Sequence, residues 1–181
     1  MLSELSHYQA LVADRYIIKE KIGAGGMGVI WAAMPYHDPS QDVAIKFIPR
    51  SIGISAEGVL RIQKEAALMA RLHHPSIICF HELGVYGQRG AAGWDGYYMV
   101  MEIGAGRTLK ESIKGGRDLD FFFQVALQVT SALDYTHGKN IIHRDIKPQN
   151  IMTGDTYPDR GFLVKVLDFG VARLAEATHE G

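Results

Sequence analysis

The stretch HRDIKPQN at residues 143–150 is the most informative part of this 181-residue sequence. It brings a carboxylate (Asp145), two cations (Arg144 and Lys147) and an amide (Asn150) together between apolar pairs at 141–142 and 151–152. Pro148 disfavours helical backbone at the residue before it, so a non-helical loop is expected here. Polar side chains gathered in this way predict a site that carries chemistry.

A second acidic position follows downstream. Asp168-Phe169-Gly170 comes directly after the apolar residues 162–167, which are typical of a strand. A carboxylate at a strand end can hold a metal ion, and glycine permits a sharp reversal of the chain. The tripeptide alone is common, but its position after residues 143–150 makes it informative.

Upstream, residues 23–28 read GAGGMG between two strand-like segments, 16–22 and 29–34. One alternative is a dinucleotide-binding loop, for which Asp42 stands at a suitable distance, but that loop must open a helix. Residues 29–31 are Val-Ile-Trp and favour a strand. A hairpin flap whose glycines let backbone N–H groups approach phosphate oxygens is therefore the better interpretation.

A lysine, Lys46, stands among apolar neighbours in the predicted strand 42–49. Burying its ammonium requires an anion, although a lysine facing water on an edge strand would be the simpler interpretation of this segment alone. Residues 55–72 predict a helix with Ser55 as N-cap. Its two faces carry Leu60, Lys64 and Leu68 on one side and Ile62, Glu65, Met69 and Leu72 on the other.

The remaining pattern predicts two more strands, 77–85 and 97–103, joined by a glycine-rich loop at 87–96. A second helix is expected at 118–137, ended by Gly138, followed by short strands around a turn at 154–161. The apolar face of this helix is predicted to consist of Phe122, Val125, Val129, Ala132 and Leu133.

Composition indicates an ordinary globular protein, with 47% hydrophobic and 22% charged residues. The net charge of −1 provides no basic field for nucleic acid, and no such partner is expected. The single cysteine, Cys79, excludes an intrachain disulfide and favours a reducing compartment. Without a signal-like N-terminus or a membrane-length apolar run, a cytoplasmic chain that does not enter a membrane is expected.

Five elements occur in a fixed order: the glycine-rich loop, Val43-Ala44-Ile45-Lys46, the helix Glu65, His-Arg-Asp and Asp-Phe-Gly. This set resembles the protein-kinase signature, and the Gly-Gly-Met-Gly loop is most similar to that of bacterial, eukaryotic-like Ser/Thr kinases. The resemblance covers residues 16–175. It implies an α+β two-lobe fold in which an antiparallel β N-lobe with one helix precedes an incomplete, mainly helical C-lobe.

The implied domain limits are an N-terminal extension at 1–15 and a kinase domain at 16–181. Within the domain the N-lobe would cover 16–103, and the hinge and partial C-lobe 104–181, truncated in the activation segment. The implied activity is ATP-dependent phosphorylation of Ser or Thr hydroxyls on a protein substrate.

The resemblance assigns catalysis to Asp145, which would accept the substrate hydroxyl proton, with Lys147 near the γ-phosphate. Asn150 and Asp168 would hold Mg²⁺, and Arg144 would read a phosphorylated activation loop. Met101 matches the gatekeeper beside the adenine. The positions implied to bind ATP are Ile22, Gly23, Ala24, Gly25, Gly26, Met27, Gly28, Ile30, Ala44, Lys46, Glu65, Glu102, Gly104 and Met152.

The family's Ala-Pro-Glu motif and later helices do not follow Gly170. We therefore expect the apolar face of the helix at 118–137 to meet water at Phe122, Val125 and Val129. The alternative function is a catalytically incompetent fragment that binds ATP or dimerises. A dinucleotide-dependent oxidoreductase, the third alternative, rests only on the glycine loop.

Overall fold

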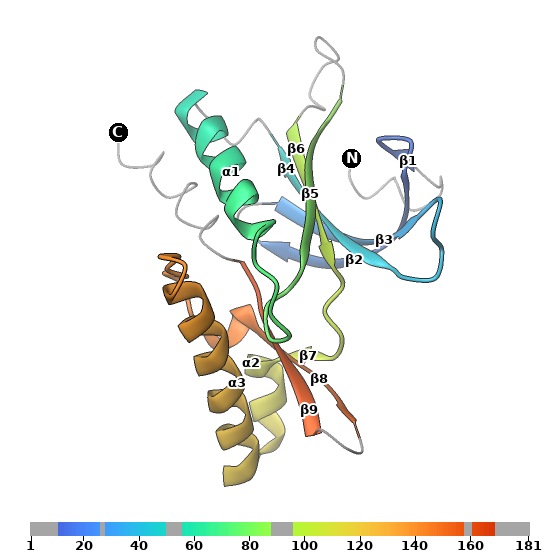
Figure 1. Ribbon diagram of the computed structural model, residues 1–181. Helices are drawn as coiled ribbons and strands as arrows, with labels where there is room; N and C mark the ends of the chain where they lie inside the picture. Colours follow the sequence, from blue (N-terminus) through green and yellow to red (C-terminus); the bar gives the residue numbers. More distant parts are fainter. Residues whose placement is uncertain (1–10, 26–27, 50–55, 88–95, 158–160, 169–181) are drawn as a thin grey trace.

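A computed structural model describes residues 11–25, 28–49, 56–87, 96–157 and 161–168, which form two sheets with helices beside them (Figure 1). The upper sheet has six strands in the order β1-β2-β3-β4-β6-β5, and α1 (Ala56–Met69) lies against it. Its strands are β1 (Leu11–Val12), β2 (Tyr16–Gly25), β3 (Gly28–Pro35), β4 (Val43–Pro49), β5 (Phe80–Tyr86) and β6 (Gly96–Glu102).

Alternating side chains explain why both faces of the upper sheet are buried. On β4, Ile48 packs toward α1 with Ala66 and Met99, while Ile45 packs on the opposite face with Trp31. All neighbouring strands are antiparallel. This confirms the predicted antiparallel sheet with one helix.

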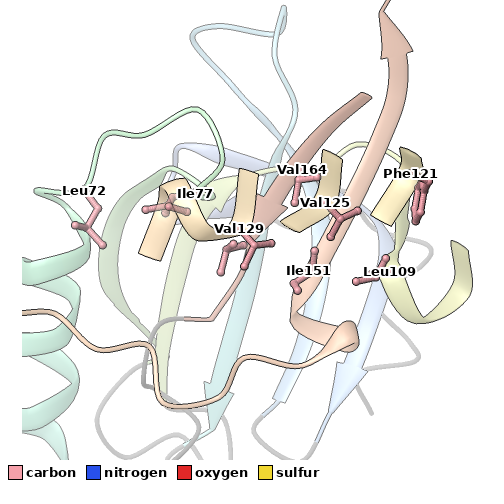
Figure 2. Packing of buried hydrophobic residues seen from close by; sticks show 10 residues of the cluster. Leu72, Ile77, Leu109, Phe121, Val125, Val129, Ile151 and Val164 are labelled. Carbon is pink, nitrogen blue, oxygen red and sulfur yellow. The ribbon is translucent and has the colours of Figure 1, made fainter. Parts of the chain in front are cut away.

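The lower part is built on a three-stranded sheet of β7 (Arg107–Thr108), β8 (Ile151–Tyr157) and β9 (Gly161–Val166). Its helices are α2 (Leu109–Ser112), η3 (Ile113–Gly115), α3 (Leu119–His137) and η4 (Pro148–Asn150). Figure 2 shows how α3 packs on this sheet through Val125 and Val129, which lie near Ile151 and Val164. Leu72 and Ile77 extend the same core to the segment after α1.

The predicted inner face of α3 needs a correction. Asp118 caps the helix by accepting a hydrogen bond from the Phe121 N–H at 2.9 Å, and this start directs Phe121 into the core while Phe122 is 45% exposed. Val125 and Val129 are buried, so the expectation that they meet water is wrong. The apolar side chains that α3 does expose are those of Leu119, Phe122, Phe123 and Leu127.

Other element limits differ from the predicted ones by a few residues. On α1 the buried face is that of Ile62 and Ala66, whereas Leu60 and Leu68 are exposed. The predicted cap Ser55 and the loop at 88–95 lie outside the described residues. Gly138 ends α3 in a right-handed conformation (φ −60°), so the left-handed turn expected of a C-terminal glycine is absent at this position.

The predicted strand at 77–85 begins three residues later, at Phe80. Ile77 instead forms a parallel bridge with Val166 of β9, where the Ile78 N–H donates to the Val166 carbonyl at 3.0 Å. The Val166 N–H in turn donates to the Ser76 carbonyl at 2.9 Å. The chain between α1 and β5 therefore joins the upper and lower parts of the molecule.

The outer edge of β9 is closed by a side chain from α3. The Gln128 amide nitrogen donates to the Phe162 carbonyl at 2.9 Å, and its carbonyl oxygen accepts from the Val164 N–H, also at 2.9 Å. One glutamine thus fills the hydrogen-bonding positions that a further strand would use. Among the described residues no helix is long and apolar enough to cross a membrane.

Candidate active site

The loop at 143–150 is held in place by a buried histidine. His143 is 1% exposed and accepts a hydrogen bond from the Asp145 N–H at Nδ1, so Nε2 carries the proton and donates to the Leu167 carbonyl at 2.6 Å. Burial lowers the pKa of the His143 imidazole, an effect opposed by the bond to Leu167 and by the Asp145 charge. The histidine therefore fixes the loop to the chain just before Asp168.

Asp145 lies at the centre of this loop. Its carboxylate accepts hydrogen bonds from Lys147 Nζ at 2.7 Å and from Asn150 Nδ2 at 2.9 Å. The bond from Lys147, with smaller help from Asn150, lowers the pKa of the Asp145 carboxyl below its ordinary value. A carboxylate that stays ionised and partly exposed can accept a proton from an approaching hydroxyl.

Local backbone geometry presents these groups. Lys147 is extended (φ −155°), as Pro148 predicts, and η4 then turns Asn150 inward, where it is 8% exposed. Arg144 and Asp168 have positive φ values of 67° and 51°, which non-glycine residues rarely adopt. Such backbone strain is frequently found at functional sites.

Lys46 reaches the lower part from β4. Its side chain is only 6% exposed, and Nζ lies 3.0 Å from the Asp168 carboxylate, whose side chain is 31% exposed. The anion that the buried ammonium requires is therefore present in the described residues. The predicted partner Glu65 belongs to α1, but its side chain lies outside the described residues.

The glycine-rich segment is a hairpin, as predicted. Gly25 of β2 pairs with Gly28 of β3, and Gly23 pairs with Ile30, while Gly26 and Met27 lie outside the described residues. A strand follows the glycines, which contradicts the dinucleotide-binding alternative. Gly28 adopts φ +136°, and a Cβ at this position would collide with the Phe47 carbonyl oxygen. Ala24 of β2 lies within the same hairpin. Ile22, the residue of β2 that precedes Gly23, is 45% exposed.

Ala44 and Met101 are directly paired across β4 and β6, and Glu102 ends β6. We call residues 102–106, which lead from β6 to β7, the hinge segment. Gly104 of this segment lies so close to the Met152 sulfur that an added Cβ would overlap it. Ile30 and Ala44 thus lie in the upper sheet and Met152 in the lower sheet, while Gly104 lies in the hinge segment that joins the two.

Sequence patterns alone assign no role to His143 or to Lys165, which bond the Leu167 carbonyl and the Glu102 carboxylate. Lys165 stands among apolar residues in β9, and the reasoning that a buried lysine needs an anion would have identified it as it did Lys46. Phe169 and Gly170 lie outside the described residues.

The donor chemistry suits a hard divalent cation bound with phosphates. Asp168 and Asn150 offer carboxylate and amide oxygens, and Mg²⁺ is usually held by only one or two such protein groups together with substrate phosphates and water. Among the described residues no group of three or more His, Cys, Asp or Glu side chains could hold a metal by itself. A buried ammonium beside Asp168 adds the positive charge that phosphates require.

Comparison with known proteins places these features in a family. Residues 16–180 match the model described as the protein kinase domain. A probable serine/threonine-protein kinase of Clostridium acetobutylicum is 34% identical over 167 residues, which are 91% of this chain and 23% of that protein. The serine/threonine-protein kinase PrkC of Bacillus subtilis is 34% identical over 92% of this chain and 24% of its own length. The chain thus spans about a quarter of these relatives.

Solved structures agree with the fold. The kinase domain of Mycobacterium tuberculosis PknI matches with a TM-score of 0.73 at 21% identity, over 91% of this chain and 63% of that one. Rad53, crystallised in complex with AMP-PNP, matches with a TM-score of 0.69 at 27% identity over 87% of this chain and 38% of that one.

Proposed function

The chain belongs to the protein kinase domain family, and from this premise we propose that it carries the ATP site and catalytic loop of an enzyme that phosphorylates Ser or Thr hydroxyls on proteins. The observation that carries the proposal is the convergence of Lys46, Asp168 and the loop at 143–150. Lys46 comes from the upper sheet and the other groups from loops of the lower part, and together they supply a cation, a carboxylate and an ionised base.

The residues fit the cofactor that this family uses, Mg²⁺ with ATP, which supplies the transferable phosphoryl group. We propose that Lys46, now bound to Asp168, would also contact the α- and β-phosphates of ATP. Asp168 and the Asn150 side-chain oxygen would hold the metal. The amide nitrogen of Asn150 already points at Asp145, which leaves its oxygen available for a cation on the other side.

Asp145 acts as the base in this proposal. It accepts the proton of a substrate hydroxyl, and Lys147 keeps the carboxylate ionised and adds positive charge where phosphate oxygens gather. Because catalysis in this class is largely positioning and neutralisation of charge, fixing these side chains from His143 and Asn150 is itself part of the chemistry.

We propose that adenine lies between apolar side chains of the two sheets, with Ile22, Ile30 and Ala44 above and Met152 below. Met101 would border the ring as gatekeeper. Backbone groups of Glu102 and Gly104 would supply hydrogen bonds to its edge. Gly23, Ala24, Gly25, Gly26, Met27 and Gly28 would cover the phosphates, and Glu65 would steady Lys46 from α1.

The proposed partner is a protein that carries a Ser or Thr acceptor, and the proposed location is the cytoplasm, where ATP is available. Arg144 is exposed within the loop at 143–150 and is proposed to pair with a phosphorylated residue of the activation segment. The second candidate is an ATP-binding chain that dimerises without turnover. The exposed apolar side chains of α3 favour association, so this candidate is tested alongside the first.

The test separates binding from turnover. Calorimetry measures ATP binding to the chain with and without Mg²⁺, and transfer of labelled phosphate to a protein substrate is measured on the natural gene product. Binding that strengthens with Mg²⁺, together with transfer, supports the kinase. Binding without transfer supports the second candidate, and absence of binding overturns both.

A further inference from the structure

Glu102 is fixed at the point where the chain leaves the upper sheet. Its backbone N–H donates to the Cys79 carbonyl at 2.8 Å, and its carboxylate accepts from the Cys79 N–H at 3.1 Å. Both the main chain and the side chain of Glu102 are therefore held by the same neighbouring residue. The side chain reaches toward the lower sheet, where it meets Lys165.

Lys165 of β9 meets this carboxylate. Its Nζ lies 2.9 Å from each of the two carboxylate oxygens, and the Ile77 carbonyl is 3.5 Å away. The Lys165 side chain is 14% exposed and that of Glu102 33%. Of the ion pairs found among the described residues, this one and Lys46–Asp168 join the upper sheet to the lower part.

Met152 is the residue of β8 directly paired with Lys165. Side chains of directly opposed residues in a sheet project from the same face, so Met152 and Lys165 approach the hinge segment together. Met152 contacts Gly104, while Lys165 contacts Glu102 two residues earlier. The hinge segment therefore touches one cross-strand pair at two adjacent points.

Building on the proposed ATP site, we propose that the ion pair of Glu102 and Lys165 is a positioning pair that sets the gap between the hinge segment and Met152, and with it the fit of the adenine ring. Neither side chain needs to touch the nucleotide. The pair acts through Met152, whose place relative to the hinge is fixed once Lys165 is bound to Glu102.

The contacts of β9 explain why an apolar side chain at position 165 would not position the hinge segment equally well. With the charge removed, β9 keeps its bridge to Ile77 and its bonds to Gln128, so the lower sheet stays assembled. Cys79 still holds the Glu102 main chain, so what is lost is the direct ion pair from β9 to the hinge segment. The hinge is then less firmly placed against Met152, and a flat ring that rests on Met152 with its edge at the hinge loses part of its fit.

The test is ATP binding by calorimetry, with and without Mg²⁺, to the chain and to Lys165→Met. We expect affinity to fall at least fivefold in both conditions and by the same factor, because the adenine end is loosened while Lys46 and Asp168 are untouched. Glu102→Gln, which retains an acceptor for the Cys79 N–H, serves as the second variant if Lys165→Met does not fold. Lys165→Arg should restore affinity.

Lys19→Met is the matched control. It breaks the pair between Lys19 and Asp42, at 2.6 and 2.8 Å, which lies within the upper sheet and should not change ATP affinity. Unchanged affinity in Lys165→Met overturns the positioning role while leaving the proposed function intact. A loss confined to the Mg²⁺ condition also overturns it, because the pair would then act on Asp168. Absence of ATP binding in the unaltered chain overturns the proposed function itself.

Discussion

Lys46 Nζ and a carboxylate oxygen of Asp168 are 3.0 Å apart, although 122 residues separate them in the chain. The contact joins the middle of β4 to Asp168, two residues after the end of β9, so one ion pair links the upper sheet to the lower part. Both groups belong to the proposed phosphate and metal site.

Lys46→Met and Asp168→Asn should each abolish phosphate transfer and weaken Mg²⁺-dependent ATP binding by well over tenfold. The reason is that each removes a charge that no other described residue at the site replaces. Calorimetry and labelled-phosphate transfer measure the two effects. A loss below tenfold, equivalent to about 1.4 kcal/mol, would contradict the assigned roles.

Asp145→Asn should reduce the turnover number strongly, by a factor of about 100 or more, while ATP affinity stays within a factor of about two. An amide cannot accept the substrate proton, but it can still meet Lys147 and Asn150 through its oxygen. Steady-state kinetics and calorimetry on the same preparation give both quantities. If ATP binding is lost as well, Asp145 supports the structure or the metal instead.

Gly28→Ala should destabilise the chain by roughly 1–3 kcal/mol, because its φ of +136° and the nearby Phe47 carbonyl leave no room for a Cβ. Gly23→Ala is the matched control. A Cβ there meets only Ile30 atoms at 3.7 Å or more, at ordinary contact distance. Thermal melting compares the two, and equal melting temperatures would show that the hairpin adapts to either change.

Acidification should lower stability through His143. Its pKa is lowered by burial in the folded chain, so the unfolded chain, with an ordinary value of about 6.5, binds the proton more readily. The stabilisation is complete above the unfolded pKa and is lost as the pH falls from there through the lower folded value. Urea unfolding at about pH 7.5 and about pH 5.5 measures the change. His143→Phe should show a smaller pH dependence, although His74, whose pKa burial also lowers, retains part of it.

The outer side of α3 should make the 181-residue chain associate. Leu119, Phe123 and Leu127 are 71%, 59% and 63% exposed, and the chain should bind a hydrophobic dye through them. Leu127→Lys should reduce dye fluorescence and association while changing stability by only about 0.5 kcal/mol. Val129→Ala, a buried control, should cost roughly 1–3 kcal/mol and leave dye binding nearly unchanged. A monodisperse chain that does not bind the dye would contradict this prediction.

The strands of the upper sheet were predictable because the sequence signals that identify them are local. Alternation along β4 and the glycines between β2 and β3 identify strands and a hairpin without reference to distant residues. The motif order predicts that Lys46, Asp145, Asn150 and Asp168 belong to one site, and the structure pairs Lys46 with Asp168 and Asn150 with Asp145.

The features of the fold that the sequence did not predict correctly have physical causes. Residues 121–123 are all phenylalanine, so hydrophobicity cannot distinguish the inward one; the Asp118 cap decides it. The two-residue strands β1 and β7 are too short for a periodic signal. The pairing of Glu102 with Lys165 joins residues 63 positions apart, and no local pattern records it.

The amide of Gln128 protects the edge of β9 from pairing with a strand of another copy. An uncovered strand edge recruits other strands, and β9 would offer such an edge if α3 were absent. During synthesis α3 emerges before β9, so the glutamine is already available when the β8–β9 hairpin forms. The hairpin can therefore meet its own chain before it meets a neighbouring copy.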